Sequence, residues 1–211
     1  MSQLDSLHWP YPIKYGEQTS HDVDVLVLGG GIAGVWAAIA AARRGARVAI
    51  MEKGDTRRSG AGGTGCDHWQ WAADNPGSGV TPEELTEALV ANHGGWRNGM
   101  STYVQCASGY ETLLELESMG AKVRDVDDEF TGAPFRDEQT KLLYAYDYDN
   151  RFVIRVWGAN FKPLLRMECL RRGVQIIDRT NATALLTENG RHGARIAGAT
   201  GQVDKDHRWL P

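Results

Sequence analysis

The sequence predicts an α/β domain in which helices cover a parallel sheet and a β-hairpin extends it. Three observations support this fold class. Residues 23–53 read as strand, glycine turn, helix and strand, and two helical segments follow in the middle of the chain. Near the end, two strand-forming runs flank the turn sequence Glu188-Asn189-Gly190. A chain of 211 residues can bury a core of this kind.

The first strand and helix meet at a glycine motif. The apolar run Val23 to Leu28 leads into Gly29, Gly31 and Gly34 at GxGxxG spacing. In this motif the first glycine permits a tight turn, the second lets backbone approach a diphosphate, and the third allows close helix–strand packing. The helix expected from Ile32 to Arg44, ending at Gly45, would point its unpaired amides and positive dipole end at the phosphates.

An acidic residue completes the motif. The second strand, Arg47 to Met51, ends at Glu52, whose carboxylate can accept hydrogen bonds from the ribose of a dinucleotide. The combination predicts a Rossmann-like, dinucleotide-binding fold. The uncharged run Val25 to Ala42 is close to the length of a membrane span, but its glycines would weaken such a helix and its first residues favour a strand.

The remaining elements follow in chain order. Residues 54–80 form a long glycine-rich loop, and a helix capped by Thr81 and Glu84 runs to about His93. Further helices are expected at Ser101 to Met119 and at Pro163 to Arg172, each followed by a glycine. Strands are expected over the alternating tyrosines Tyr144, Tyr146 and Tyr148, at Phe152 to Val156, at Val174 to Ile177, and in a hairpin of Thr180 to Thr187 with Arg195 to Ala199.

Composition excludes several classes of protein. A net charge of −4 and a pI near 5.9 argue against a nucleic-acid-binding protein. Cys66, Cys106 and Cys169 form no CxxC pair, so we expect neither a metal site nor an iron–sulfur cluster in this chain. Residues 1–22 are polar and broken by prolines, unlike a signal peptide, which leads us to expect a cytoplasmic location.

A second glycine-rich loop, Arg57 to Gly65, follows the acidic residue. A nicotinamide-binding domain does not need a second such loop, and an ordinary flexible loop could have this composition. A flavin-binding domain does need one, because FAD extends past its diphosphate and backbone must approach it closely. The loop therefore favours FAD over NAD.

These motifs together resemble the flavoprotein subunit of the fumarate reductase and succinate dehydrogenase superfamily, and most closely the alpha subunit of adenylylsulfate reductase. The resemblance rests on Tyr11 to Glu17, Val25 to Gly34, Arg58 to Ala61, and Gly158 to Leu165 with the hairpin after it. Members of that family are much longer, so the chain resembles their N-terminal part only. The segment Gly62 to Trp69 departs from the adenylylsulfate reductase pattern.

The resemblance implies a set of FAD contacts. Succinate dehydrogenases carry a histidine that bonds covalently to FAD where this chain has Gly60, so non-covalent binding is implied. His68, on the glycine-rich loop, is the one candidate for an acid or base. The implied cofactor-binding residues are Gly29, Gly31, Ile32, Ala33, Gly34, Glu52, Lys53, Ser59, Gly60, Ala61 and Ala182.

Three functions remain open on these grounds. The first is an FAD-dependent oxidoreductase that transfers electrons between a small-molecule substrate and a ferredoxin-like iron–sulfur partner. The second is a truncated or split FAD-binding module without catalysis of its own, and the third is an NAD-dependent dehydrogenase. The expected organisation is an extended arm (1–22), the N-terminal portion of an FAD-binding domain (23–203) and an irregular tail (204–211).

Overall fold

The computed structural model describes residues 18–145 and 151–203, and within them the chain forms three sheets and four α-helices. In chain order the elements are β1 (Val25–Leu28), α1 (Ile32–Arg43), β2 (Val48–Met51), β3 (His68–Trp69), α2 (Pro82–Asn92), α3 (Gly99–Ser118), β4 (Leu143–Tyr144), β5 (Ile154–Arg155), α4 (Phe161–Arg171), β6 (Gln175–Ile177), β7 (Thr180–Thr187) and β8 (Ile196–Val203). Two 3₁₀ turns, η2 (Gly158–Asn160) and η3 (Glu188–Gly190), complete the list.

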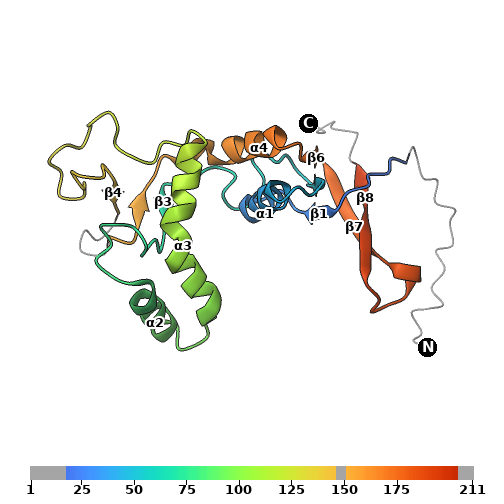
Figure 1. Cartoon of the computed structure of the whole chain (residues 1–211), viewed down its shortest axis with the longest axis horizontal. Helices are drawn as coiled ribbons and strands as arrows, with labels where there is room; N and C mark the ends of the chain where they lie inside the picture. The colour runs from blue at the N-terminus through green and yellow to red at the C-terminus, as the bar shows by residue number, and fades with distance from the viewer. Residues whose placement is uncertain (1–17, 146–150, 204–211) are drawn as a thin grey trace, which may run out of the picture.

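A parallel sheet with strand order β1-β2-β6 forms the centre of the domain. Val25 lies opposite Val48, and Ile50 lies opposite Ile176. Helices α1 and α4 run beside each other along this sheet (Figure 1), and Ile39 and Leu165 contribute fully buried side chains to the shared core. The predicted Rossmann-like α/β class is confirmed.

A second lobe lies beyond the parallel sheet, and the sequence did not predict it as a unit. It contains the small antiparallel sheet β3-β5-β4 and the helix pair α2 and α3, which Figure 1 shows at the end opposite the hairpin. Strands of two residues are too short for alternation to reveal, so β3 was expected to be loop. Of the expected tyrosine strand, Tyr144 lies in β4, whereas Tyr146 and Tyr148 are outside the described residues.

Several element boundaries differ from the expected ones for local reasons. Helix α3 begins at Gly99 because the Asn98 side chain accepts from the Ser101 amide at 2.9 Å and caps it. Helix α4 begins at Phe161, two residues before the expected start at Pro163. Pro163 fits within the first turn, because amides there have no carbonyl partner in the helix and the amide that proline lacks is not needed. The capping box predicted for α2 is present: Glu84 donates its amide to Thr81 at 3.2 Å, and Thr81 donates its own to Glu84 at 2.8 Å.

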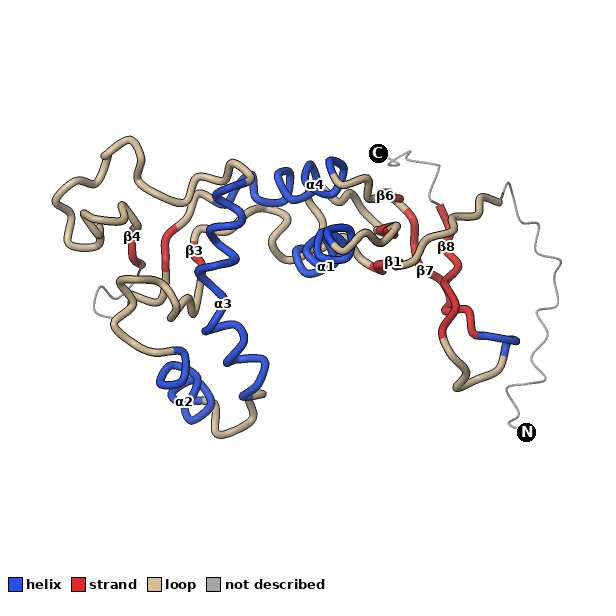
Figure 2. Tube along the Cα trace, in the orientation of Figure 1, coloured by secondary structure: helices blue, strands red, loops and turns tan. Residues whose placement is uncertain are grey.

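The hairpin of β7 and β8 projects from the end of the parallel sheet (Figure 2). Its second strand runs to Val203, beyond the expected end at Ala199. Leu185 and Ile196 are 57% and 52% exposed, so much of the hairpin's apolar surface faces solvent. The division into arm, domain and tail stays a prediction, because residues 1–17 and 204–211 lie outside the described part of the chain.

The uncharged run Val25 to Ala42, close in length to a membrane span, divides into a strand, a turn and a helix. Across residues 18–145 and 151–203, no helix has the length and apolar character that a membrane crossing would require.

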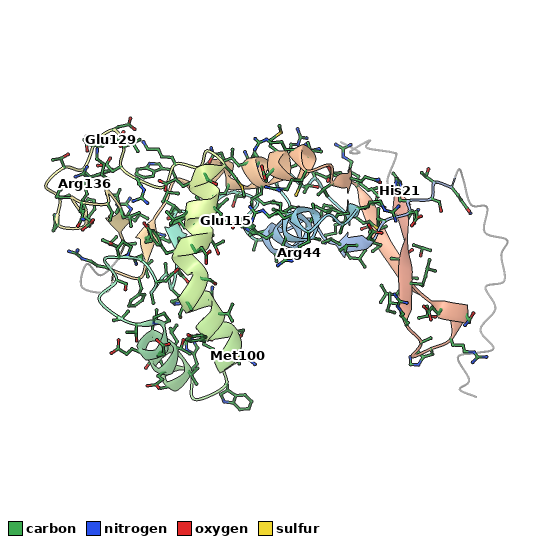
Figure 3. All side chains as sticks on the ribbon, viewed as in Figure 1. His21, Arg44, Met100, Glu115, Glu129 and Arg136 are labelled. Atoms are coloured by element: carbon green, nitrogen blue, oxygen red, sulfur yellow. The ribbon has the colours of Figure 1, made fainter. Side chains whose placement is uncertain are left out.

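At the far end of the second lobe, charged groups hold together the acidic segment of residues 125–138 (Figure 3). The guanidinium of Arg136 is buried and pairs with Asp125 at 2.9 Å, and with Asp128 and Glu138. Asp125 also accepts from the amides of Glu129 and Phe130, each at 3.0 Å, and burial opposes the lowering of its pKa by these hydrogen bonds. The buried pair of Arg136 and Asp125, bonded in turn to two exposed carboxylates and two amides, fixes the path of a segment that lacks regular structure.

Candidate nucleotide-binding site

The turn between β1 and α1 has the geometry of a phosphate-binding loop. Gly29 has φ +103°, a conformation that suits glycine, and Gly31 is the N-cap residue of α1. A Cβ on Gly34 would lie 1.9 Å from the Gly29 carbonyl oxygen, so helix and strand approach as closely as the motif predicts. No side chain caps α1, so its first-turn amides and the positive end of its dipole are directed at the space over the turn.

The Glu52 carboxylate lies directly against this turn. It accepts from the Gly30 amide at 2.5 Å and from the Gly54 amide at 2.7 Å, and the residue is only 5% exposed. The backbone of Glu52 in turn bonds to β6 and to the start of β7: its amide donates to Ile177 at 3.0 Å, and its carbonyl accepts from the Thr180 amide at 2.8 Å. Glu52 thus joins the glycine turn, the end of the sheet and the hairpin.

The carbonyl of Gly30 receives two side-chain donors from distant parts of the chain. Ser59 donates its hydroxyl at 2.8 Å, and Lys162, from the first turn of α4, donates its ammonium. Lys162 is 1% exposed, and burial lowers its pKa while Glu52 opposes that shift. Nothing predicted a role for Lys162; the one available signal was a lysine between the core residues Phe161 and Leu165.

The second glycine-rich loop packs onto the start of α1. Gly60 has φ +80°, and a Cβ on it would lie 2.8 Å from the Cα of Gly31. A Cβ on Gly62 would lie 2.2 Å from the Ile32 side chain. The Ile32 side chain can move to make room at position 62, but a larger residue at position 60 would push the loop off the Gly31 backbone, so Gly60 permits the two loops to lie in contact.

Two hollows lie at the end of the second loop and after it. One, of about 410 Å³, is lined by residues 64–67 and 156–159. The other, of about 420 Å³, lies between β3 and α3 and includes Trp69, Gln105 and Thr112 in its lining. Cys66 contributes to both, and Arg58 fixes the rim of the first by donating to the Ala159 carbonyl at 2.8 Å.

The chemistry-bearing side chains near these hollows are Cys66 and His68. Burial raises the pKa of the Cys66 thiol, and the neighbouring Asp67 adds to the effect, so a reactive thiolate is not favoured. His68 lies 2.7 Å from Asp67, Nδ1 to Oδ1, and this hydrogen bond lowers the pKa of Asp67. Cys106 and Cys169 are buried core residues, as expected.

The structure brings most of the predicted site residues together around one turn. Gly29, Gly31, Ile32, Ala33, Gly34, Glu52, Ser59 and Gly60 line or support it. Lys53 and Ala61 are exposed beside it, and Ala182 lies on β7, two residues beyond the amide that bonds to Glu52. His68 lies apart from this group, on β3 and not in a loop.

A glycine cradle, an uncapped helix start and a carboxylate at the end of the next parallel strand define a dinucleotide-binding domain. Comparison with known proteins gives the family: residues 24–208 match the FAD binding domain family, and the chain belongs to it. The resemblance to flavoproteins is thereby confirmed, and FAD is the cofactor of the domain.

Individual proteins are similar to this chain in sequence or in fold. L-aspartate oxidase of Mycobacterium leprae is 36% identical over 104 residues, which are 48% of this chain and 19% of that protein. Adenylylsulfate reductase of Archaeoglobus fulgidus superposes with a TM-score of 0.69 and 21% identity over 86% of this chain and 27% of its own. Mycobacterium smegmatis Sdh1 in complex with UQ1 gives 0.66 and 20% over 87% and 31%. The matched parts are thus about a third or less of these longer proteins.

Proposed function

We propose that the chain holds FAD non-covalently over the β1–α1 turn and forms the cofactor domain of an FAD-dependent oxidoreductase. The observation that carries this proposal is the Glu52 carboxylate, held against the glycine turn at the uncapped start of α1. The bound flavin would supply the redox chemistry. The chain's own residues would bind and orient it.

Each predicted residue has a part in this proposal. Gly29, Gly31 and the amides of Ile32, Ala33 and Gly34 would meet the diphosphate, and Glu52 would hold the ribose with Lys53 beside it. The carboxylate oxygens of Glu52 can accept further hydrogen bonds in addition to those from Gly30 and Gly54. Ser59, Gly60 and Ala61 would flank the diphosphate and flavin, and Ala182 would offer backbone groups to the adenine.

Non-covalent attachment is supported by the residue at position 60. Glycine has no side chain that could bond to the flavin, and it lies in contact with Gly31 at the start of α1. We also propose His68, which lines the second hollow, as an acid or base. Its pairing with Asp67 holds the ring in place.

The activity of the whole protein is the wider part of the proposal. The compared proteins are named L-aspartate oxidase, adenylylsulfate reductase and Sdh1. The function we propose is electron transfer between a small-molecule substrate and a ferredoxin-like iron–sulfur partner, in the cytoplasm. A non-catalytic FAD module, completed by another chain, remains the second candidate. The family match argues against the NAD-dependent alternative.

Flavin binding by the 211-residue chain tests the central claim. Purified protein titrated with FAD should quench flavin fluorescence, and NAD in excess should not displace it. Acid precipitation should release all of the flavin into the supernatant, since no covalent link is expected. A chain that binds NAD in preference to FAD, or that binds neither, would contradict the proposal.

A matched pair of variants tests the role of Glu52. Glu52→Gln should weaken FAD binding roughly tenfold or more, because charged hydrogen bonds are worth about 1.5–3 kcal/mol and tenfold is about 1.4 kcal/mol. Glu111→Gln, an exposed glutamate on α3, is the control and should bind FAD as the wild type does. Equal affinities for both variants would remove Glu52 from the site.

A further inference from the structure

Lys162 is a buried cation with no assigned role. It lies in the first turn of α4, is 1% exposed, and donates to the carbonyl of Gly30. The same carbonyl accepts the Ser59 hydroxyl at 2.8 Å, while the Gly30 amide donates to Glu52 at 2.5 Å. Both polar groups of Gly30 are therefore bonded to side chains, and two of those side chains are ionisable groups of opposite sign.

Two carboxylates act on this ammonium from the ends of two strands, since Glu52 follows β2 and Asp178 follows β6. The thiol of Cys169, on α4 itself, also lies near it, and burial raises the pKa of that thiol to about 11, so it is neutral. Asp178 is already engaged, because it accepts from the Thr56 amide at 2.8 Å and lies 3.7 Å from Arg166. Burying an ammonium is costly unless other groups stabilise its charge, so a lysine here must contribute something that a neutral side chain could not.

We propose that Lys162 is a positioning residue for the diphosphate: it fixes the Gly30 carbonyl and adds a buried positive charge to the turn whose amides meet the phosphates. This inference rests on the proposed FAD site. A neutral donor could hold the carbonyl equally well. Only a cation also attracts a bound dianion, and that attraction is weakly screened at a buried position.

If the charge of Lys162 acts on the diphosphate, it should affect ligands that carry phosphates and not those without them. ADP and adenosine share the nucleoside and differ in the diphosphate, so the ratio of their affinities isolates the phosphate contribution. In the 211-residue chain, Lys162→Met should weaken ADP binding about tenfold or more and change adenosine binding by less than about twofold. Lys162→Arg keeps the charge and should retain more of the preference for ADP than Lys162→Met does.

The pH dependence provides a second readout in the wild-type protein. A bound dianion favours the charged form of Lys162, so binding takes up a proton once pH exceeds the lowered pKa of the free protein. The preference for ADP over adenosine should therefore fall as pH rises from neutral into the alkaline range. In Lys162→Arg the preference should stay constant, because a guanidinium does not titrate there.

The outcomes separate the claims. If Lys162→Met weakens ADP and adenosine equally, Lys162 is only structural and the inference is overturned. If Lys162→Met shows no cooperative thermal unfolding, the wild-type pH series decides, and a preference for ADP that is independent of pH overturns it. If the wild-type chain binds neither FAD nor ADP, it is the proposed function that fails.

Discussion

Side chains from distant parts of the chain, two of them charged, hold the glycine turn of residues 29–34, whereas the loop of residues 57–65 lies in close backbone contact with its neighbours. Gly30 is bonded to Glu52, Ser59 and Lys162. The second loop depends on missing side chains: Gly60 lies on Gly31, and a Cβ on Gly65 would lie 2.8 Å from the Cα of Ala159. The first loop is thus a preorganised binding element, and the second loop packs against it through its backbone.

This difference suggests which substitutions should affect folding and which should affect only binding. A methyl group placed between helix and strand cannot be relieved by a side-chain rotation. A methyl group on the open side of the turn would leave the fold intact and obstruct a ligand.

Gly34→Ala should have the largest effect. The new Cβ would lie 1.9 Å from the Gly29 carbonyl oxygen, so strand and helix must separate, at an expected cost of about 3 kcal/mol or more in the free energy of unfolding. Urea denaturation measures it. Gly99→Ala, at the start of α3 with its nearest neighbour at 4.0 Å, is the matched control and should be neutral or slightly stabilising.

Gly31→Ala should separate binding from folding at the same turn. A Cβ here meets only the Gly60 Cα, at 3.6 Å, which is an ordinary contact, and the backbone at φ −64° accepts alanine. We expect the unfolding free energy to change by less than about 1 kcal/mol while FAD affinity falls at least about tenfold. An unchanged FAD affinity would mean that the diphosphate does not approach this glycine.

The sequence allowed much of the first loop to be predicted and little of what anchors it. GxGxxG spacing and the acid after β2 are local patterns, so Gly29, Gly34 and Glu52 could be placed before the fold was known. The bond between Lys162 and Gly30 spans 132 residues, and it exists only because α4 packs beside α1. No pattern in the sequence encodes such a contact.

The second lobe also shows that local patterns could be predicted from the sequence and long-range contacts could not. The capping box of Thr81 and Glu84 is encoded within four residues and was predicted correctly. Sheet β3-β5-β4 joins two-residue strands from positions 68, 143 and 154, where tertiary pairing and not alternation determines the structure. His68 was consequently expected in a loop, although it pairs with Arg155 in this sheet.

Gly60→Ala tests whether the second loop depends on its contact with the first. The substitution adds the strain of φ +80° and a Cβ 2.8 Å from the Gly31 Cα, with an expected total cost of about 2 kcal/mol. Gly193→Ala, at φ +78° with nothing within 4 Å, shows the strain alone and should cost about 1 kcal/mol. Equal losses in thermal unfolding would show that the two loops are not tightly packed together.

The smallest expected effect concerns Asp55, two residues before the second loop begins. Its carboxylate accepts from the amide of Arg57 at 2.9 Å and from the guanidinium, and the side-chain bond to Arg57 lowers the pKa of Asp55 from 3.8 to about 2. Because the folded-state pKa of Asp55 is depressed, this stabilisation is fully present above pH 3.8 and is lost as the pH falls towards 2.

Arg57 is 63% exposed, so solvent weakens its pair with Asp55, and Asp55→Asn should lower the neutral-pH Tm by no more than about 2 °C. The variant should also lose less stability than the wild type between pH 3.8 and about 2. Arg57→Gln removes the other partner of the pair and should reduce the loss of stability between pH 3.8 and about 2 to a similar extent. If wild type and both variants lose stability equally over this pH range, the start of this loop, unlike the glycine turn, has no ionic anchor of consequence.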